Sequence, residues 1–178
     1  MASGAGYTGL MKKSTTTGFS IIELLVTIAV GSIMLTVAAP SFTNLYKSSS
    51  ITSQTNSLST ALQYAHDQAT KLPVGSTAVD VIPNAANDWS QGWVVQIRGG
   101  VTLRTYPAAP RNVTMVGDVT GNGTIAFNAP FGYPDPTGNA NGTATITICD
   151  NDRVGETGRQ LNVNRTGRIS LNLSFTCS

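Results

Sequence analysis

The spacing of hydrophobic and polar residues changes twice along the chain after residue 18. Residues 19–39 are almost continuously apolar, residues 41–72 are apolar at intervals, and the remainder consists of short runs separated by turn-forming residues. These patterns are typical of a membrane-spanning helix, an amphipathic helix and β-strands, respectively. The sequence therefore predicts one long N-terminal helix followed by a β-rich region.

The apolar run at residues 19–39 contains a single charged residue, Glu23. At about 1.5 Å per residue the run would form roughly 32 Å of helix, enough to cross a hydrocarbon layer of about 30 Å. Lys12 and Lys13 precede it, so the positive-inside bias places the N-terminus in the cytoplasm and the residues after Pro40 outside. We therefore expect a single-pass anchor.

A cleaved secretory signal is the main alternative for this segment, since it also combines a basic start, an apolar run and small residues such as those in "VAAP". The apolar run is longer than the usual signal core of about 7 to 15 residues, and cleavage would leave Pro40 directly after the cut. Glu23 is the stronger objection to a signal. An acid inside the membrane costs roughly 2.5 to 3.5 kcal/mol on insertion scales, so this carboxylate indicates a function that involves a partner.

The second helical stretch has one apolar face. Its members recur at spacings of three, four and seven: Ile51, Leu58, Ala61, Leu62, Ala65, Ala69 and Leu72. We expect this face to pack against the rest of the protein and the helix to end at Pro73 and Gly75, with Lys71 in its last turn. His66, the only histidine, lies off the apolar face, and we expect it to face solvent without a catalytic or metal-binding role.

The remaining residues indicate strands and turns. Candidate strands are residues 78–82, 93–98, 101–106, 113–116, 124–127, 143–149, 160–163 and 168–175. Gly99 and Gly100 indicate a two-residue hairpin turn between two of them. One long helix followed only by strands predicts an α+β fold in which antiparallel sheets cover the apolar face of the helix.

The segment "GFSIIE" at residues 18–23 follows a short basic leader and opens the apolar run. Its form, Gly-Phe-x-x-x-Glu, resembles the class III signal of type IV pilins and of type II secretion pseudopilins. The resemblance implies that prepilin peptidase cleaves after Gly18 and methylates the new amine of Phe19. It also implies that Glu23 pairs with the terminal amine of a neighbouring pilin or pseudopilin subunit. Met11 would give a leader of more typical length, which makes it a candidate for the true start.

The same resemblance gives Glu23 and Pro40 physical roles. A carboxylate–amine pair is strong in a medium of low dielectric constant, where an unpaired charge is penalised, so such a pair would favour one register between subunits. Pilin helices commonly have a proline where this chain has Pro40. Proline removes a backbone donor and kinks or loosens a helix.

The predicted order of segments is a cleaved leader (1–18), a transmembrane half-helix (19–40), an amphipathic half-helix (41–73) and a β-rich head (74–178). The resemblance implies that the protein is anchored in a bacterial inner membrane with a periplasmic head and then enters a fibre. In the head, "TITICD" and "GRQLNVNRTGRISL" resemble minor pilins of the FimT and FimU type and the pseudopilin GspH. We therefore expect a structural minor pilin acting in pilus assembly or priming, with a GspH-like secretion pseudopilin as an alternative.

The composition bears on two points, the net charge of the chain and a possible disulfide. Charged residues make up 11% of the chain, and the formal net charge of +2 does not by itself indicate a nucleic-acid partner. The even count of two cysteines in an exported chain favours a bridge between Cys149 and Cys177, which would hold the C-terminus in place. Two separate buried thiols are the alternative.

Candidate chemistry is sparse. A single histidine on a polar helix face offers little for nucleophilic catalysis, so we expect neither an enzyme nor a cofactor. The segment "CDNDRVGE" places Asp150, Asp152 and Glu156 close together. We interpret it as a solvated acidic turn, with calcium binding as the alternative, and therefore expect no metal site.

A basic cluster near the C-terminus makes DNA a candidate partner. Residues 157–178 contain Arg159, Arg165 and Arg168 and no acid, and such a patch could contact phosphates. In the FimT-like subset that the chain resembles, a Gly-Arg-x-Arg step near the C-terminus is associated with DNA binding during natural transformation. Here Ser170 replaces the second arginine of that step. We favour a structural role for the arginines over DNA as a further partner.

Overall fold

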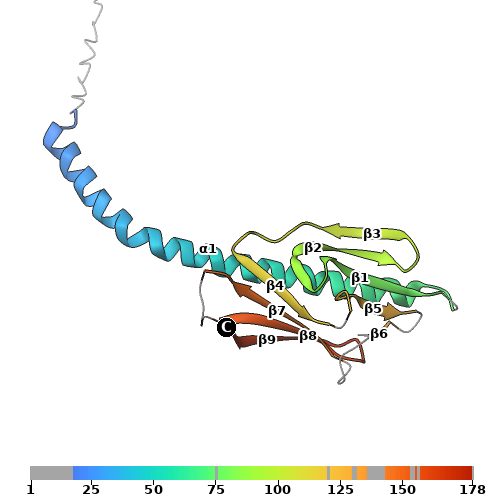
Figure 1. Ribbon diagram of the computed structural model, residues 1–178. Coiled ribbons are helices and arrows are strands. Elements are labelled where there is room, and N and C mark those ends of the chain that lie inside the picture. Colours follow the sequence, from blue (N-terminus) through green and yellow to red (C-terminus); the bar gives the residue numbers. More distant parts are fainter. Residues whose placement is uncertain are drawn as a thin grey trace, which may run out of the picture. The chain divides into compact units, whose positions relative to one another are not determined.

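The computed structural model describes residues 18–74, 76–119, 121–129, 132–135, 143–152, 155 and 157–177. The described residues form one helix and nine strands (Figure 1). The chain divides into two compact units between Phe42 and Thr43, and the helix contributes to both. The elements are α1 (Ile21–Lys71), β1 (Ala78–Ala85), β2 (Asp88–Ile97), β3 (Val101–Tyr106), β4 (Val113–Asp118), β5 (Ile125–Asn128), β6 (Tyr133–Asp135), β7 (Ala144–Asp150), β8 (Thr157–Val163) and β9 (Ile169–Thr176).

The first unit contains the start of α1. The helix begins at Ile21, close to the predicted start of the apolar run, and its first backbone bond joins the amide of Leu24 to the carbonyl of Ser20 at 3.1 Å. By length and composition, no single helix among the described residues is long and apolar enough to cross a membrane, whereas two parts of α1, Ile21–Thr36 and Ser41–Lys71, meet these criteria when taken together. The leader residues 1–17, including Met11, lie outside the described residues.

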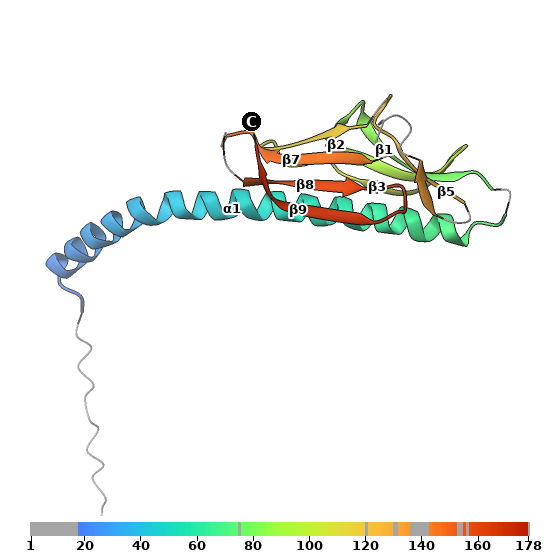
Figure 2. The ribbon, with the colours of Figure 1, turned by 90° about the horizontal axis from the view of Figure 1, so that it is seen from below.

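The second unit is an α+β head in which α1 lies along one face of an antiparallel sheet (Figure 2). The strand order is β6-β5-β1-β2-β4-β7-β8-β9, and β3 pairs with β2 outside this order. All pairs are antiparallel, and the β1–β2 ladder aligns Val79 with Ile97 and Val81 with Val95. This confirms the predicted fold class.

The apolar face of α1 is buried in the head, as its spacing predicts. Six of its members are at most 5% exposed: Ile51, Leu58, Ala61, Leu62, Ala65 and Ala69. The sheet covers them with large buried side chains that include Trp89, Trp93, Phe127, Met115 and Ile146. Burying a side chain of this size stabilises the fold by about 1.5–3 kcal/mol relative to exposure, so this contact is the main energetic tie between helix and sheet.

The β1–β2 hairpin is longer than predicted. Its strands extend to Ala85 and from Asp88, although Pro83 and the polar residues after it indicate a loop. Pro83 is accommodated because the ladder register shifts between Pro83 and Ala85. Asn87 makes the turn with a φ of 59°, in the left-handed region that asparagine tolerates.

Two other turns and strands differ from expectation. The predicted two-residue turn at Gly99 and Gly100 is wrong: Ile97 pairs with Val101, so Arg98 belongs to the turn as well. The short strand β6 was not predicted, because it contains Pro134. It pairs with β5 at one edge of the sheet, where a proline removes no bond that the sheet requires.

His66 is not simply solvated, in contrast to the expectation. Its side chain is 36% exposed, and its ring meets Phe127 edge-on with 6.1 Å between the ring centroids. Gly132 and Gly167 pack against the ring from two loops: a Cβ at Gly132 would come within 2.9 Å of His66 Cδ2, and one at Gly167 within 3.2 Å. His66 is therefore a packing residue under two turns of the head. Gly75, the expected helix stop, lies outside the described residues.

Candidate functional site

The residues of the predicted processing and assembly motif lie together at the start of α1. Gly18 and Phe19 precede the helix, Phe19 is 80% exposed, and Glu23 is exposed in the first helical turn. A carboxylate in the first turn interacts favourably with the helix dipole, which supports helix formation at this end. Pro40 lies within α1, and its side chain lies outside the described part of the structure.

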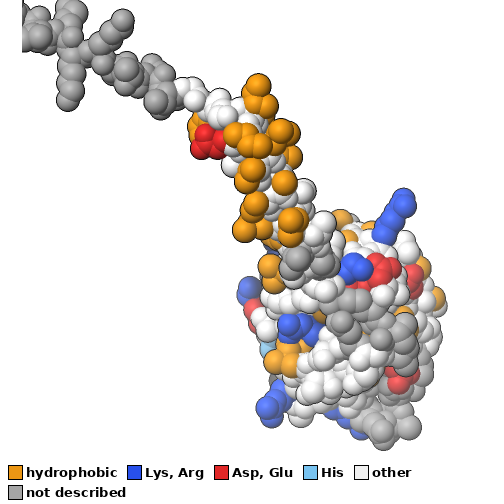
Figure 3. Space-filling model, turned by 90° about the vertical axis from the view of Figure 1, so that its left-hand side faces the viewer, with side chains coloured by type: hydrophobic (Ala, Val, Ile, Leu, Met, Phe, Trp, Pro, Cys, Tyr) orange, Lys and Arg blue, Asp and Glu red, His pale blue; other side chains and the backbone are white. Residues whose placement is uncertain are grey.

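The N-terminal unit has no polar side in its described part, residues 18–42. Twelve large hydrophobic residues are between 48% and 80% exposed: Phe19, Ile21, Ile22, Leu24, Leu25, Val26, Ile28, Val30, Ile33, Met34, Leu35 and Phe42. Because successive residues of a helix point about 100° apart, this set surrounds the helix. Figure 3 shows hydrophobic side chains and an acidic group on the visible face of this part of the helix. A helix that is hydrophobic all round is normally buried in protein or lipid.

Three hydroxyl groups in the first part of α1 satisfy their hydrogen bonds within the helix. Each donates to the carbonyl oxygen three residues earlier: Thr27 to Leu24 at 2.8 Å, Ser32 to Ala29 at 2.8 Å and Thr36 to Ile33 at 2.7 Å. An unsatisfied hydroxyl would be costly in an apolar medium. These residues therefore need no external polar partner, and Glu23 is left as the charged group of the segment.

The predicted disulfide joins Cys149 and Cys177, with 5.9 Å between their Cα atoms. It crosses β8, because Cys149 belongs to β7 and Cys177 follows β9. Gly158 of β8 lies directly beneath it, where a Cβ would overlap the sulfur of Cys177. The alternative of two separate thiols is excluded, and the C-terminus is fastened to the sheet.

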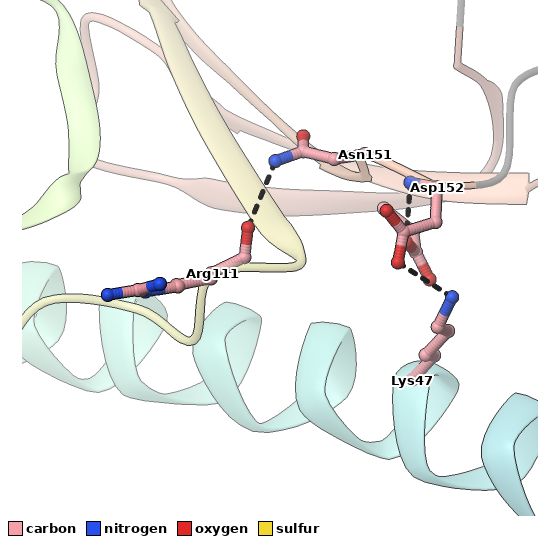
Figure 4. Close-up of polar contacts among 5 residues, drawn as sticks. Lys47, Arg111, Asn151 and Asp152 are labelled. Carbon is pink, nitrogen blue, oxygen red and sulfur yellow. Dashed lines mark hydrogen bonds and ion pairs between the residues drawn. The ribbon is translucent and has the colours of Figure 1, made fainter.

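Polar contacts fasten the β7–β8 region to α1 and to the segment before β4. Lys47 of α1 forms an ion pair of 2.8 Å with Asp152, and the side-chain amide of Asn151 donates to the carbonyl of Arg111 at 3.1 Å (Figure 4). The amide of Asp152 in turn donates to the carboxylate of Asp150 at 3.0 Å. Two acids of the expected acidic turn are thus engaged with protein groups, and Glu156 lies outside the described residues.

The three arginines of the basic cluster are not at one place. Arg159, at the start of β8, donates to the hydroxyl of Thr52 on α1 at 3.0 Å and is half-buried. Arg165 and Arg168 are exposed on the β8–β9 turn, beyond the end of β8 at Val163. At about 3.3 Å per residue, the strand separates the two positions by roughly 13 Å. Arg159 therefore has a partner within the head, and Arg165 and Arg168 form the exposed pair.

A second charged contact of the head had no signal in the sequence. Arg98 binds the carboxylate of Asp80 with both oxygens engaged, at 3.1 Å and 2.9 Å. The Asp80 side chain is 8% exposed and that of Arg98 is 47% exposed. The two residues meet because the β1–β2 register places Asp80 one position from the Val79–Ile97 pair. The hairpin pattern could have indicated this contact only if its register had been known.

The comparisons with known proteins agree with this architecture. A family model described as type II transport protein GspH matches residues 54–167, and one described as a prokaryotic N-terminal methylation motif matches residues 13–39. No curated protein matches the chain in sequence.

Two crystal forms of the type IV minor pilin FimU from Pseudomonas aeruginosa are similar in structure. One has a TM-score of 0.54 with 24% identity and covers 71% of this chain and 99% of FimU. The other has a TM-score of 0.55 with 24% identity and covers 72% of this chain and 95% of FimU. At 24% sequence identity, the similarity to FimU shows a shared fold alone. Because the GspH model spans more than half of the sequence, the chain belongs to the GspH family of type IV pilin-like proteins.

Proposed function

We propose that this protein is a membrane-anchored structural subunit of a pilin-type fibre and acts as a minor pilin in pilus assembly or priming. The main observation behind the proposal is the first part of α1, in which apolar side chains surround the helix and Glu23 is the charged residue of the apolar run at residues 19–39. Such a surface requires an apolar environment, first the inner membrane and then the interior of a fibre. The head remains in the periplasm and contributes no enzymatic step.

Processing precedes assembly in this proposal. Prepilin peptidase cleaves after Gly18, and the new terminal amine on Phe19 becomes methylated. The methylation-motif match over residues 13–39 and the position of Gly18 just before α1 support this order. Cleavage produces a positive charge at the end of a helix that otherwise carries a carboxylate, Glu23, in its first turn.

Glu23 then sets the register of the subunit among its neighbours. Its carboxylate pairs with the terminal amine of an adjacent subunit. In an apolar interior an unpaired ion is penalised by several kcal/mol, and the attraction between two paired ions offsets part of that penalty. The serine and threonine hydroxyls that bond within their own helix do not compete for this role.

A secretion pseudopilus is the second candidate fibre. It is favoured by the description of the matching family model as a type II transport protein. The surface of the N-terminal unit fits either fibre, because both would surround it with apolar helices. Genes for pilus biogenesis or for secretion beside this one would separate the two, as would loss of piliation or of protein secretion in a deletion strain.

DNA contact is a further activity that two exposed arginines support. Arg165 and Arg168 lie on the β8–β9 turn without an acid within residues 157–178. Phosphate contacts from two arginines would give weak, salt-dependent binding without sequence preference.

The proposal is tested by mass spectrometry of the membrane form and of purified fibres. The expected chain begins at methylated Phe19 and retains the apolar helix. A chain that begins at Pro40 or Ser41 would show that the helix is a discarded signal. Fibres that lack the protein altogether would also contradict the assembly role.

A further inference from the structure

A cleft of about 490 Å³ lies in the head between α1 and β3. Its helix wall consists of four polar residues with exposed or half-buried side chains: Ser53, Asn56, Ser57 and Thr60. These positions are spaced as i, i+3, i+4 and i+7, so they form one face of the helix, distinct from the buried apolar face. The other wall is formed by the last three residues of β3.

The cleft borders the edge of β3 and not one of its faces. Arg104, Thr105 and Tyr106 all contribute to the lining, although neighbouring residues in a strand point to opposite sides of the sheet. β3 pairs with β2 and with no other described strand. One edge of β3 therefore presents backbone amide and carbonyl groups next to the hydroxyl-lined helix, an arrangement that an added strand could complete.

Arg104 gives this edge a positive charge that is held in place. Its guanidinium lies over two rings, 5.6 Å from the centroid of Tyr64 and 5.7 Å from that of Tyr106. No carboxylate among the described residues pairs with Arg104, and none lines the cleft. Contact with the two rings limits its motion, so little conformational entropy remains to be lost when a carboxylate binds.

The positive charge of Arg104 indicates which kind of molecule can occupy the cleft. A second copy of β3 would bring two Arg104 side chains near each other, which disfavours pairing between identical edges. A nucleic acid would require several cations along its backbone, and Arg104 is the cation of this lining. An extended acidic segment matches the free edge through its backbone and Arg104 through a bidentate carboxylate contact.

We propose that the cleft receives an extended segment of a neighbouring fibre subunit, which adds to the edge of β3 and places an aspartate or glutamate against Arg104. The inference rests on the proposed function only in naming the partner as a fibre subunit. Ser53, Asn56 and Ser57 supply small polar groups along the other side of the bound segment.

The binding test uses the full-length protein in detergent and two labelled peptides of alternating threonine and valine, one with a central glutamate and the other with glutamine. Fluorescence anisotropy should show the glutamate peptide binding about tenfold or more tightly, as expected for a charge-assisted contact. Arg104→Gln should remove this difference, whereas Arg111→Gln, an exposed arginine outside the cleft, should retain it. Equal binding of the two peptides, binding of neither, or displacement by a single-stranded oligonucleotide would overturn the proposal.

A second variant covers the case in which Arg104→Gln unfolds. Asn56→Trp places a large ring on an exposed helix position that lines the cleft and leaves Arg104 unchanged. It should abolish binding of the glutamate peptide while thermal unfolding stays within a few degrees of the parent. Retained binding in a folded Asn56→Trp protein would contradict occupancy of the cleft.

The amount of each variant found in purified fibres tests the cleft proposal separately from the proposed function. Arg104→Gln should reduce the amount of subunit in purified fibres several-fold relative to Arg111→Gln. If Arg104→Gln is incorporated normally while Glu23→Gln is excluded, the subunit role stands and the cleft proposal fails. If neither the parent nor any variant enters fibres, the proposed function fails, and the peptide measurements still decide the cleft.

Discussion

Gly158 lies against Cys177, because the disulfide of the head passes directly over this position. A Cβ at residue 158 would overlap the sulfur of Cys177 and come within 2.7 Å of the carbonyl oxygen of Ile148. Strands on either side of a third are about 9.6 Å apart, yet the two cysteine Cα atoms are 5.9 Å apart. The chain after β9 must therefore turn back over β8, and the absence of a side chain at Gly158 permits this.

Gly158→Ala should destabilise the head and slow disulfide formation. The new methyl group meets backbone and sulfur atoms, which cannot move aside as a flexible side chain would. We expect a loss of about 1–3 kcal/mol in the free energy of unfolding, typical of overpacking. Chemical unfolding combined with titration of free thiols would measure both effects. Gly31→Ala is the control and should leave the head unchanged, because apart from its chain neighbours and the adjacent helix backbone no atom lies within 4 Å of the new methyl group.

Removal of the disulfide itself should lower the free energy of unfolding more than Gly158→Ala does. The bridge closes a loop with a sequence separation of 28 residues, for which chain entropy predicts about 3–4 kcal/mol of stabilisation. Reduced protein, or the Cys149→Ser variant, should unfold at a correspondingly lower denaturant concentration. Equal unfolding midpoints with and without reductant would contradict this role for the bridge.

The Arg98–Asp80 contact predicts that Arg98→Gln and Asp80→Asn lower the free energy of unfolding by different amounts. Arg98→Gln leaves the buried Asp80 carboxylate without its bidentate partner, which should cost about 1–3 kcal/mol, because hydrogen bonds to charged groups are worth that much. Asp80→Asn removes the buried charge as well and should cost less. Urea unfolding of both variants and of the double variant would measure the coupling. A larger loss for Asp80→Asn would show that the carboxylate has another essential partner.

The parts of the fold that follow from local periodicity were predictable. Leu58, Leu62 and Ala65 recur at helical spacing and are fully buried. The α+β class follows from one helix and many short alternating runs. His66 shows where this reasoning ends, since it lies off the apolar face but is covered by loops containing Gly132 and Gly167. The packing of a loop onto a helix leaves no periodic signal in the sequence.

Those residues of the candidate site that lie close together in the sequence were predictable. Gly18, Phe19 and Glu23 lie within six residues of one another, so their spacing could be read directly from the sequence. Arg159 and Arg165 are also close along the chain, but an intervening strand separates them in space. The cleft at Arg104 depends on which strand edges remain unpaired, and strand order could not be derived from the sequence pattern.

Glu23→Gln should allow membrane insertion and impair assembly. The amide is less costly in lipid than the carboxylate, so the anchor is retained, but the terminal amine of a neighbour loses its counter-charge. We expect at least a tenfold decrease in the subunit found in sheared, purified fibres, with unchanged amounts in the membrane fraction. Thr27→Val, which removes a hydroxyl bonded within its own helix, is the control and should assemble normally. Normal incorporation of Glu23→Gln would show that the acid has no assembly role.

The exposed pair Arg165 and Arg168 predicts how DNA binding would respond to substitution. If DNA is bound, gel retardation by the double variant Arg165→Gln/Arg168→Gln should be weaker at low salt. The slope of log affinity against log salt concentration should decrease by about 0.9 for each lost duplex phosphate contact. Arg159→Gln should leave DNA affinity unchanged and lower stability slightly, because this side chain bonds to Thr52. Equal loss from Arg159→Gln, or no retardation by the intact protein at low salt, would argue against phosphate binding by this turn and leave its arginines as solvated surface residues.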